Sequence, residues 1–271
     1  MTDRRLTPAN GRVAAMHLAG QVEADTFVLG AEKMLLAPVT DLCASPAGAR
    51  DRQLLLGAIV TVFEDRDGWS FVQAIDGYVG YVPSDALGAL SPPSHFVATM
   101  ATHAYQAEDF KSRDVMHLPF GARVTVLDER RKFFETSVGF VPKKHLRGLD
   151  QPFTDPATVA QLHFGVPYLW GGNSTSGIDC SGLIAASLTS CAMGCPADSD
   201  LQCEALGADV SGALRRGDLI FWKGHVGMMV DEHTLIHANV HHMATRYEPL
   251  DQAIARIKAQ GDGHVTAQKR L

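Results

Sequence analysis

The sequence predicts an α+β protein in which two small β-barrels precede a C-terminal domain of helices and one antiparallel sheet. A segment of about 60 residues, rich in short β-type runs, occurs twice between residues 31 and 148. From about residue 150, helical patterns come first, and three short apolar runs separated by glycine and charged turns follow them. The length of 271 residues is sufficient for two or three domains.

The composition is typical of globular proteins and excludes several classes. Hydrophobic residues make up 46% of the chain and charged residues 20%, which argues against disorder, a collagen-like chain and a coiled coil. No apolar run approaches the roughly 18–20 residues of a membrane helix. The net charge of −6 and the lack of a basic stripe argue against nucleic-acid binding. We therefore expect neither a nucleic-acid nor a membrane partner.

The first twenty residues predict a cytoplasmic protein, provided that Met1 is the natural start. A secretory signal needs a basic start and then an apolar run of roughly 7–15 residues, which Pro8, Asn10 and Arg12 interrupt here. The five cysteines favour a reducing compartment, because their number is odd and four of them are clustered between residues 180 and 203.

Residues 1–30 are predicted to form an N-terminal helical segment. A weakly amphipathic stretch runs roughly from Asn10 to Val28. Pro8 and Asn10 provide signals for a helix start, and Gly30 provides a signal for its end. We therefore expect a helix before the first copy of the repeat.

The two copies of the repeat share an ordered set of motifs. Each has Gly-Ala-x-Val-Thr-Val, an acidic turn, an aromatic strand, and Gly-[Tyr/Phe]-Val-Pro before a closing leucine. The first copy spans 31–90, with hairpin turns at 65–68 and 75–77, and the second spans 95–148 after a Ser-Pro-Pro-Ser linker. The Gly-Trp and Gly-Tyr-Val-Gly-Tyr-Val-Pro motifs of the first copy resemble a bacterial SH3-like domain. The second copy lacks the Gly-Trp pair and resembles this domain more loosely.

Residues 152–271 are predicted to form the C-terminal domain. Asp155 is an N-cap candidate before Pro156 at the first helical position. A second helix begins at Cys180 and is expected to end at Gly194. The predicted strands are DLIFWKG, HVGMMVD and TLIHANV, and the predicted terminal helix is PLDQAIARIK.

Cys180 is the candidate nucleophile. It follows a glycine-rich loop and begins a helix, between the polar neighbours Asp179 and Ser181. A free thiol has a pKa of about 8.5 and reacts slowly in its neutral form. The positive end of the helix dipole and a neighbouring imidazolium would lower this pKa. A buried structural cysteine is the alternative, but the polar neighbours and the glycines favour catalysis.

A nucleophilic cysteine needs a base and a group that orients the base. Of the twelve histidines, His225 is the best candidate, because it follows Gly224 directly at the start of a predicted strand. His237 lies twelve residues further along, in the next predicted strand. Two antiparallel strands would bring these histidines together, so that His237 could hold the ring of His225 in one tautomer.

Three blocks of residues connect these candidates into one pattern. They are Pro-Tyr-x-Trp-Gly-Gly with Asp-Cys-Ser-Gly-Leu, then Gly-Asp-Leu-Ile-Phe with His-Val-Gly, and then Ile-His-Ala. The pattern resembles the NlpC-type cell-wall peptidases, papain-like cysteine peptidases of bacteria. The resemblance implies a papain-like fold, with Cys180 as nucleophile, His225 as base and His237 as orienting residue. It also implies that Tyr168 helps to stabilise the oxyanion with the Cys180 amide; a plain core aromatic is the alternative.

The whole architecture is similar to that of the cytoplasmic γ-D-glutamyl-L-diamino acid endopeptidases of murein recycling, in which SH3-like modules precede the peptidase domain. This resemblance implies hydrolysis of the bond between γ-D-Glu and the diamino acid, in small murein peptides with a free N-terminal L-Ala. Residues implied to bind the amino end of the substrate are Asp179, Ser181 and Ser199 in the peptidase domain, and Tyr81, with Tyr78 as its alternative, and Glu64 in the first module.

No metal or cofactor is expected. The cysteines within residues 191–203 have a spacing that a metal site allows, but no fourth ligand is obvious, and small buried residues are the better interpretation. His237 and the histidine pair at 241–242 form a second cluster, but a zinc ion there would occupy the partner of the proposed base.

Two other functions remain open. A papain-like acyltransferase would use the same cysteine and histidine on another acyl donor. A non-catalytic wall-peptide-binding protein would depend on the SH3-like pair, but it would have no need of Cys180, His225 and His237 together. Whether the diamino acid is diaminopimelate or lysine also stays open at this point, as does the oligomeric state.

Overall fold

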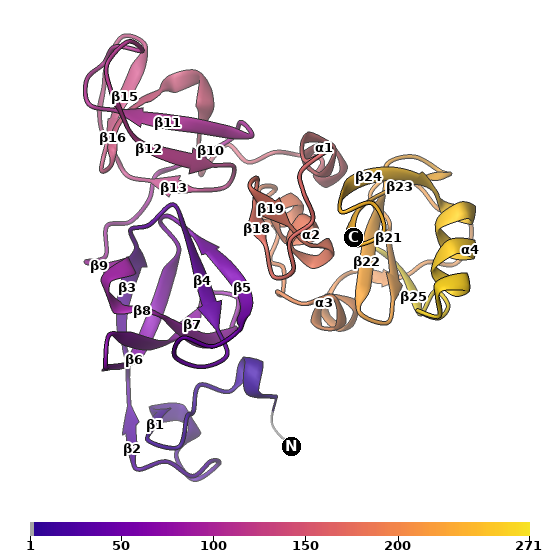
Figure 1. Cartoon of the computed structure of the whole chain (residues 1–271), viewed down its shortest axis with the longest axis horizontal. Helices are drawn as coiled ribbons and strands as arrows, with labels where there is room; N and C mark the ends of the chain where they lie inside the picture. Colours follow the sequence, from indigo (N-terminus) through magenta and orange to yellow (C-terminus); the bar gives the residue numbers. More distant parts are fainter. Residues whose placement is uncertain (1–2) are drawn as a thin grey trace. The chain divides into compact units, whose positions relative to one another are not determined.

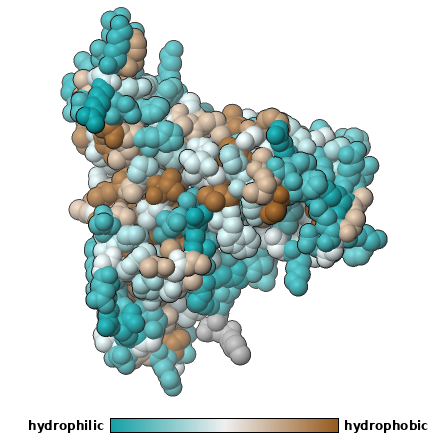
Figure 2. Space-filling view, viewed as in Figure 1, coloured by the Kyte–Doolittle hydropathy of each residue, from teal (hydrophilic) through white to brown (hydrophobic). Residues whose placement is uncertain are grey.

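The computed structural model describes residues 3–271 and divides into two compact units, unit 1 (Met1–Leu149) and unit 2 (Asp150–Leu271) (Figure 1). Hydrophilic residues cover most of the face seen in Figure 2, with hydrophobic patches between them. Of the helices within residues 3–271, none combines the length and the apolar character needed to cross a lipid bilayer.

The prediction of a helix from Asn10 to Val28 is wrong, because this segment contains short strands and a 3-10 turn. Asn10 Oδ1 instead accepts hydrogen bonds from the backbone N–H groups of Arg12 and Val13, at 3.1 and 2.9 Å, which folds the chain into a turn. Ala15 packs into an apolar cluster with Phe63 and Phe71, so burial against the first repeat outweighs the weak helical pattern. The elements here are η1 (Arg4–Leu6), β1 (Val13–Ala15), η2 (Met16–Leu18) and β2 (Thr26–Val28), with β1 and β2 parallel.

The first repeat forms a seven-stranded antiparallel sheet in the order β5-β4-β8-β7-β6-β3-β9. Its first predicted hairpin turn is confirmed, because Asp67 and Gly68 join β6 to β7 with φ of +51° and +80°. The second predicted turn joins β7 to β8. The elements are β3 (Ala31–Leu35), β4 (Val39–Cys43), β5 (Arg50–Leu55), β6 (Ile59–Arg66), β7 (Trp69–Ala74), β8 (Val79–Pro83), η3 (Ser84–Ala86) and β9 (Leu87–Gly88).

The second repeat is also built from strands. It contains a five-stranded sheet, β12-β11-β16-β15-β14, and a three-stranded sheet, β13-β10-β17. Leu56 of the first repeat packs into its core with Leu118 and Val141, so the two repeats share buried side chains. The count of two barrels stays a prediction. The elements are β10 (His95–Val97), β11 (Ala101–Tyr105), β12 (Asp114–Pro119), β13 (Arg123–Val124), β14 (Val126–Glu129), β15 (Phe133–Thr136), β16 (Gly139–Pro142), η4 (Lys143–His145) and β17 (Leu146–Gly148).

Unit 2 confirms the predicted order of helices before strands. Asp155 caps α1 by accepting from the backbone N–H of Ala157. The helix that begins at Cys180 ends before Gly194, because Ala192 adopts a left-handed conformation and the N–H of Met193 bonds to Leu188. The elements are α1 (Pro156–Leu162), β18 (Asn173–Ser174), β19 (Gly177–Ile178), α2 (Cys180–Thr189), α3 (Ser199–Ala205), β20 (Ala208–Asp209), β21 (Leu219–Trp222), β22 (His225–Met229), β23 (Thr234–Asn239), β24 (Ala244–Pro249), α4 (Leu250–Gln260) and β25 (Ala267–Arg270).

The three predicted strands are neighbours in a six-stranded antiparallel sheet, β20-β25-β21-β22-β23-β24. Helix α4 covers one face of this sheet and α2 lies on its other side (Figure 1). The α4 face is held by a buried cluster in which Ile257 packs with Trp222 and Leu235. On the other side, α2 packs against β22 and β23. Cys180 at the start of α2 therefore lies near the sheet, and this packing positions the candidate site.

Candidate active site

Cys180 is the first residue of α2, as expected, and only 8% of it is exposed. Asp179 caps the helix through Oδ1, which accepts from the backbone N–H of Gly182 at 2.7 Å and from Ser181 Oγ at 3.0 Å. A helix begins with unpaired backbone N–H groups, so this cap and the helix dipole hold the thiol at the positive end of α2.

The glycine-rich loop packs directly against the first turn of α2. Asp179 Oδ2 accepts from the N–H of Gly171 at 2.9 Å, and the Asp179 N–H donates to the Gly172 carbonyl at 3.1 Å. A Cβ added to Gly182 would lie 2.4 Å from the Gly172 oxygen, so only glycine fits there. Asp179 therefore fastens the loop and the helix together beside Cys180.

The structure brings the two predicted histidines together. His225 begins β22 and His237 lies in β23, and His225 Nε2 is 2.9 Å from His237 Nδ1. The backbone of Val226, the residue after His225, lies close enough to the Cys180 thiol to act against the rise in its pKa. Because Nε2 of His225 is hydrogen bonded to His237, Nδ1 is the ring nitrogen available to take a proton from the thiol.

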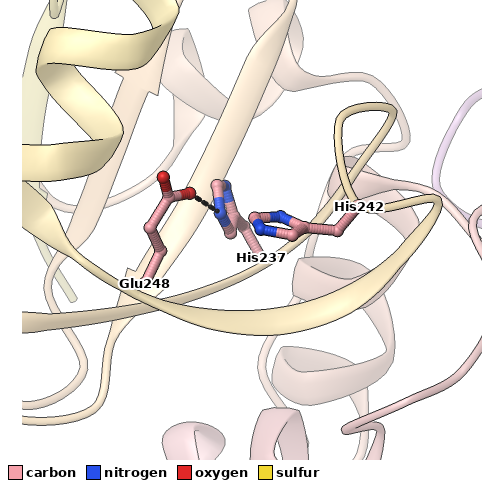
Figure 3. Close-up of side chains that lie close together, drawn as sticks. All are labelled: His237, His242 and Glu248. Atoms are coloured by element: carbon pink, nitrogen blue, oxygen red, sulfur yellow. Dashed lines mark hydrogen bonds and ion pairs between the residues drawn. The ribbon is translucent and has the colours of Figure 1, made fainter.

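The sequence analysis did not predict two further residues of the site, Glu248 and Arg256, which lie behind His237. His237 Nε2 is 3.0 Å from Glu248 Oε2, the hydrogen bond drawn in Figure 3. Arg256 of α4 donates to both oxygens of Glu248, from Nε at 2.9 Å and from Nη2 at 2.7 Å. The signal in the sequence was an acidic residue inside a β-type run directly before a helix, but its partner could not be identified without the sheet register.

The protonation states differ from those expected for an activated thiol. Burial raises the pKa of Cys180 to about 12, and the negative charge of Asp179 adds to this effect. Burial lowers the pKa of His225 to about 3, and the charges of His237 and Arg256 act in the same direction. Burial therefore favours the neutral thiol and the neutral imidazole in the free protein, and it acts against the predicted imidazolium beside a thiolate.

Tyr168 lies beside the nucleophile, as the motif implied. Its backbone N–H donates to the Met243 carbonyl at 2.9 Å, which fixes the loop before the glycines. Burial raises the pKa of the Tyr168 hydroxyl, and the charges of Cys180 and Asp179 raise it further. The Tyr168 hydroxyl is therefore protonated at neutral pH and can donate a hydrogen bond.

Ser181 and Ser199, the other residues predicted in unit 2, are both buried. Ser199 begins α3. Gln202, in the same helix, was not predicted from the sequence. Gln202 Nε2 donates to the carbonyl of Ser181 at 3.0 Å and to that of Pro196 at 2.9 Å. Gln202 therefore ties α3 to the first turn of α2, and its glutamine side chain gave no signal in the sequence.

Within unit 1, the predicted residues Glu64 and Tyr81 share a partner. Arg12 donates to Glu64 from Nε at 2.9 Å and from Nη2 at 2.6 Å, and it also interacts with the Tyr81 side chain. The charge of Glu64 is therefore already matched. Tyr78, the alternative to Tyr81, is only 3% exposed and packs under Arg52, whereas Tyr81 is half-buried.

One group among residues 3–271, His237, His242 and Glu248, has ligand atoms close enough to hold a metal ion (Figure 3). Its chemistry fits a hydrogen-bonded relay better than a metal site. A metal ion would have to displace the hydrogen bond from His237 to Glu248, and it would meet the guanidinium of Arg256 on the same carboxylate. No step of the chemistry below uses a metal.

Comparison with known proteins identifies the domains. Residues 165–259 match the NlpC/P60 family, and residues 42–87 match the bacterial dipeptidyl-peptidase SH3 domain. The C-terminal unit contains an NlpC/P60 domain. Cys180, His225, His237, Glu248 and Arg256 all lie within the matched range, so the relay belongs to this domain.

Relatives support the same assignment. The chain is 27% identical over 229 residues to a "Gamma-D-glutamyl-L-lysine dipeptidyl-peptidase" of Bacillus cereus, covering 71% of this chain and 68% of that protein. It is 25% identical over 109 residues to a "Probable endopeptidase" of Mycobacterium tuberculosis, covering 39% of this chain and 28% of that protein. An NlpC/P60 family protein from Bacillus cereus has the same fold, with a TM-score of 0.76 and 20% identity, covering 89% of this chain and 99% of that one.

Proposed function

We propose that this NlpC/P60 protein is a cysteine endopeptidase that hydrolyses the bond between γ-D-Glu and the diamino acid of murein peptides with a free N-terminal L-Ala. The observation that carries the proposal is the arrangement of Cys180 at the start of α2, a helix packed against β22, with His225 at the start of β22 held by His237 at 2.9 Å. A nucleophile, a base and an orienting group are what acyl transfer by cysteine requires.

In the proposed reaction, His225 Nδ1 takes the proton of the Cys180 thiol as the sulfur attacks the substrate carbonyl. The unpaired backbone N–H at the start of α2 and the Tyr168 hydroxyl stabilise the oxyanion. The imidazolium then protonates the leaving amine of the diamino acid, and a water molecule hydrolyses the thioester. Because burial favours the neutral forms of the thiol and the imidazole, we propose that proton transfer accompanies attack rather than preceding it.

The substrate assignment rests on the Bacillus cereus relative and on Asp179. That relative is named as a dipeptidyl-peptidase for γ-D-glutamyl-L-lysine, and removing a dipeptide requires recognition of a free amino end. The Asp179 carboxylate accepts hydrogen bonds from Gly171, Ser181 and Gly182, which are neutral donors, and burial raises its pKa. A substrate ammonium group would supply a positive charge opposite Asp179. Asp179 is therefore a better candidate than Glu64 for binding the substrate amine, because Glu64 is already paired with Arg12.

The proposal also places the enzyme in cytoplasmic murein recycling. A requirement for a free L-Ala amine excludes peptides still linked to the glycan, so small released peptides are the substrates. Ser181 and Ser199 are proposed to contact the amino end from unit 2. Tyr81 and Glu64 are proposed to take part in selection from unit 1, with Tyr81 the more accessible of the two tyrosines considered.

The test is mass analysis of L-Ala-γ-D-Glu-diaminopimelate after incubation with the full chain. We expect release of L-Ala-γ-D-Glu and free diaminopimelate, and the lysine analogue run in parallel decides between the two diamino acids. N-acetylated peptide and cross-linked murein should be poor substrates. Cleavage of those two at the rate of the free peptide would overturn the recycling role, and transfer of the acyl group to an added amine instead of water would indicate an acyltransferase.

A further inference from the structure

Two histidines in series leave the direction of their hydrogen bond undecided. Each neutral imidazole carries one proton on either of two nitrogens. If His237 Nδ1 donated to His225 Nε2, the proton of His225 would sit on Nδ1, facing the thiol, and His225 could not act as the base. If His225 Nε2 donates instead, its Nδ1 is free to accept. The 2.9 Å distance between His225 Nε2 and His237 Nδ1 allows both arrangements.

Glu248 removes this ambiguity. Its carboxylate accepts two hydrogen bonds from Arg256 and lies 3.0 Å from His237 Nε2. Burial alone would raise the pKa of Glu248, but the hydrogen bonds from Arg256 and His237 outweigh it and hold the pKa far below the usual range. An ionised carboxylate can only accept, so His237 Nε2 must carry the proton, and His237 Nδ1 must accept from His225.

The sheet register places these groups in order. His237 in β23 is opposite Arg246 in β24, and Glu248 is two residues further along β24. Alternate residues of a strand face the same side, and diagonal neighbours lie within reach of each other. Arg256 reaches Glu248 from α4, the helix packed on that side of the sheet. His237 is fully buried, so the donors and acceptors around its ring are those of the protein.

We propose that Glu248 is a positioning residue, which fixes His237 and, through it, His225 in the tautomer that leaves His225 Nδ1 free to accept the Cys180 proton. The inference rests on the proposed cysteine peptidase function. Once His225 is protonated, the same chain, from His225 through His237 to Glu248, stabilises the imidazolium. Arg256 keeps Glu248 ionised and in place, and it compensates the buried negative charge before the reaction begins.

Other charges around the pair act in known directions. His241 and Arg256 lower the pKa of His237, while Glu248 raises it. Glu248 also raises the pKa of His225, whereas His237 and Arg256 lower it. His242, in the turn between β23 and β24, is itself held by Asn239 Oδ1. Removing the carboxylate while Arg256 remains should therefore lower the pKa of the base.

The experiment compares Glu248→Gln and Glu248→Ala with wild type in the full chain. Asp218→Asn is the matched control, because it removes another carboxylate that accepts a bidentate arginine, from Arg270, in the same sheet but away from the histidines. Nitrogen-15 spectra of the imidazoles report the tautomers without any substrate. Thermal unfolding shows that each variant is folded at the temperature used, and Glu248→Gln carries the test where Glu248→Ala does not fold.

We expect wild type and Asp218→Asn to show His225 and His237 protonated on Nε2, and the Glu248 variants to show mixed tautomers. The kcat of the Glu248 variants should fall on the order of 10- to 100-fold with KM little changed, and the acid limb of kcat/KM should move to lower pH. Unchanged tautomers and kcat in a folded Glu248 variant would overturn the inference. Tautomer changes without peptide cleavage by wild type would uphold it and overturn the proposed function instead.

Discussion

Cys180 differs from the other four cysteines in its backbone position, although all five are free thiols. It begins a helix, whereas Cys43 ends a strand and Cys203 lies inside the short α3. The helix start supplies unpaired N–H groups, and the nearby Val226 backbone also acts to lower the pKa of the thiol. We therefore expect any reactivity of Cys180 to come from its backbone position, since burial by itself makes the thiol a weaker acid.

Cys180→Ala should abolish turnover and leave the fold intact. Alanine is a good helix former and is smaller than cysteine, so the first turn of α2 can keep its geometry. Product release from L-Ala-γ-D-Glu-diaminopimelate by mass analysis measures the loss, and thermal unfolding measures the fold. Cys203→Ala is the control and should retain activity. Turnover by the Cys180→Ala variant would show that another residue is the nucleophile.

Asp179→Asn should impair cleavage of the free peptide about 10- to 150-fold in kcat/KM, because a hydrogen bond to a charged group is worth roughly 1.5–3 kcal/mol. Asparagine can still cap α2 through its oxygen, but its NH2 group cannot accept from the Gly171 N–H, so the comparison with acetylated substrate separates this loss from loss of the substrate contact. N-acetylating the substrate should cost wild type a similar factor and the variant much less. Equal sensitivity of both enzymes to acetylation, measured as kcat/KM, would show that Asp179 does not meet the substrate amine.

At the scale of elements, the stability of unit 2 depends on how its last strand, β25, is attached to the sheet. β25 pairs with β21 and β20, and Arg270 near its end donates to Asp218 at 2.8 and 2.6 Å. Asp218 is 1% exposed and also accepts from the Arg215 backbone. This buried carboxylate directly precedes β21, so the ion pair fastens the C-terminal strand to the centre of the sheet.

Asp218→Asn should destabilise unit 2 by about 1.5–3 kcal/mol at pH 7. Burial alone would raise the pKa of Asp218, but Arg270 and the Arg215 backbone hold it below its ordinary value of 3.8. A lowered pKa stabilises the folded state above that ordinary value, and the contribution is lost as pH falls below it. The difference between wild type and variant, measured by hydrogen exchange of β25 amides, should therefore shrink at acid pH. A constant difference would exclude the ion pair as its source.

At the scale of the whole molecule, the internal repeat provides its own control for the role of unit 1. Tyr81 of the first repeat corresponds in the motif to Phe140 of the second. Each pairs with an earlier strand of its sheet, Tyr81 with Cys43 of β4 and Phe140 with Tyr105 of β11. Only the residue of the first repeat carries a hydroxyl and contacts an arginine, Arg12. A difference between variants at these two sites would separate substrate selection from loss of packing.

Tyr81→Ala should reduce the preference for free over N-acetylated peptide, whereas Phe140→Ala should leave that preference unchanged. Both changes remove a half-buried aromatic ring at a corresponding strand position, so similar losses of stability are expected. The measurement is the ratio of kcat/KM for the two peptides in the full chain. The same ratio in Tyr81→Ala as in wild type would remove unit 1 from substrate selection.

Local patterns in the sequence were sufficient to predict the strands of the repeat, the cap of α1 by Asp155, the start of α2 at Cys180 and the pairing of His225 with His237. Each of these depends on neighbouring residues or on two adjacent strands joined by a short turn. The NlpC/P60 assignment also followed from motifs, because each of the three blocks is a short uninterrupted run of residues that can be read without knowing the fold.

Tertiary structure decided the features that depend on distant residues. Burial of Ala15 against Phe63 overrode the helical pattern of the N-terminal segment. Burial also favours the neutral forms of the thiol and the imidazole, because desolvation is the largest cause of both pKa shifts. Glu248 and Arg256 joined the site only through the register of β23 with β24 and the packing of α4. A motif can identify the reacting groups, but the direction of their hydrogen bonds depends on which charges the fold places behind them.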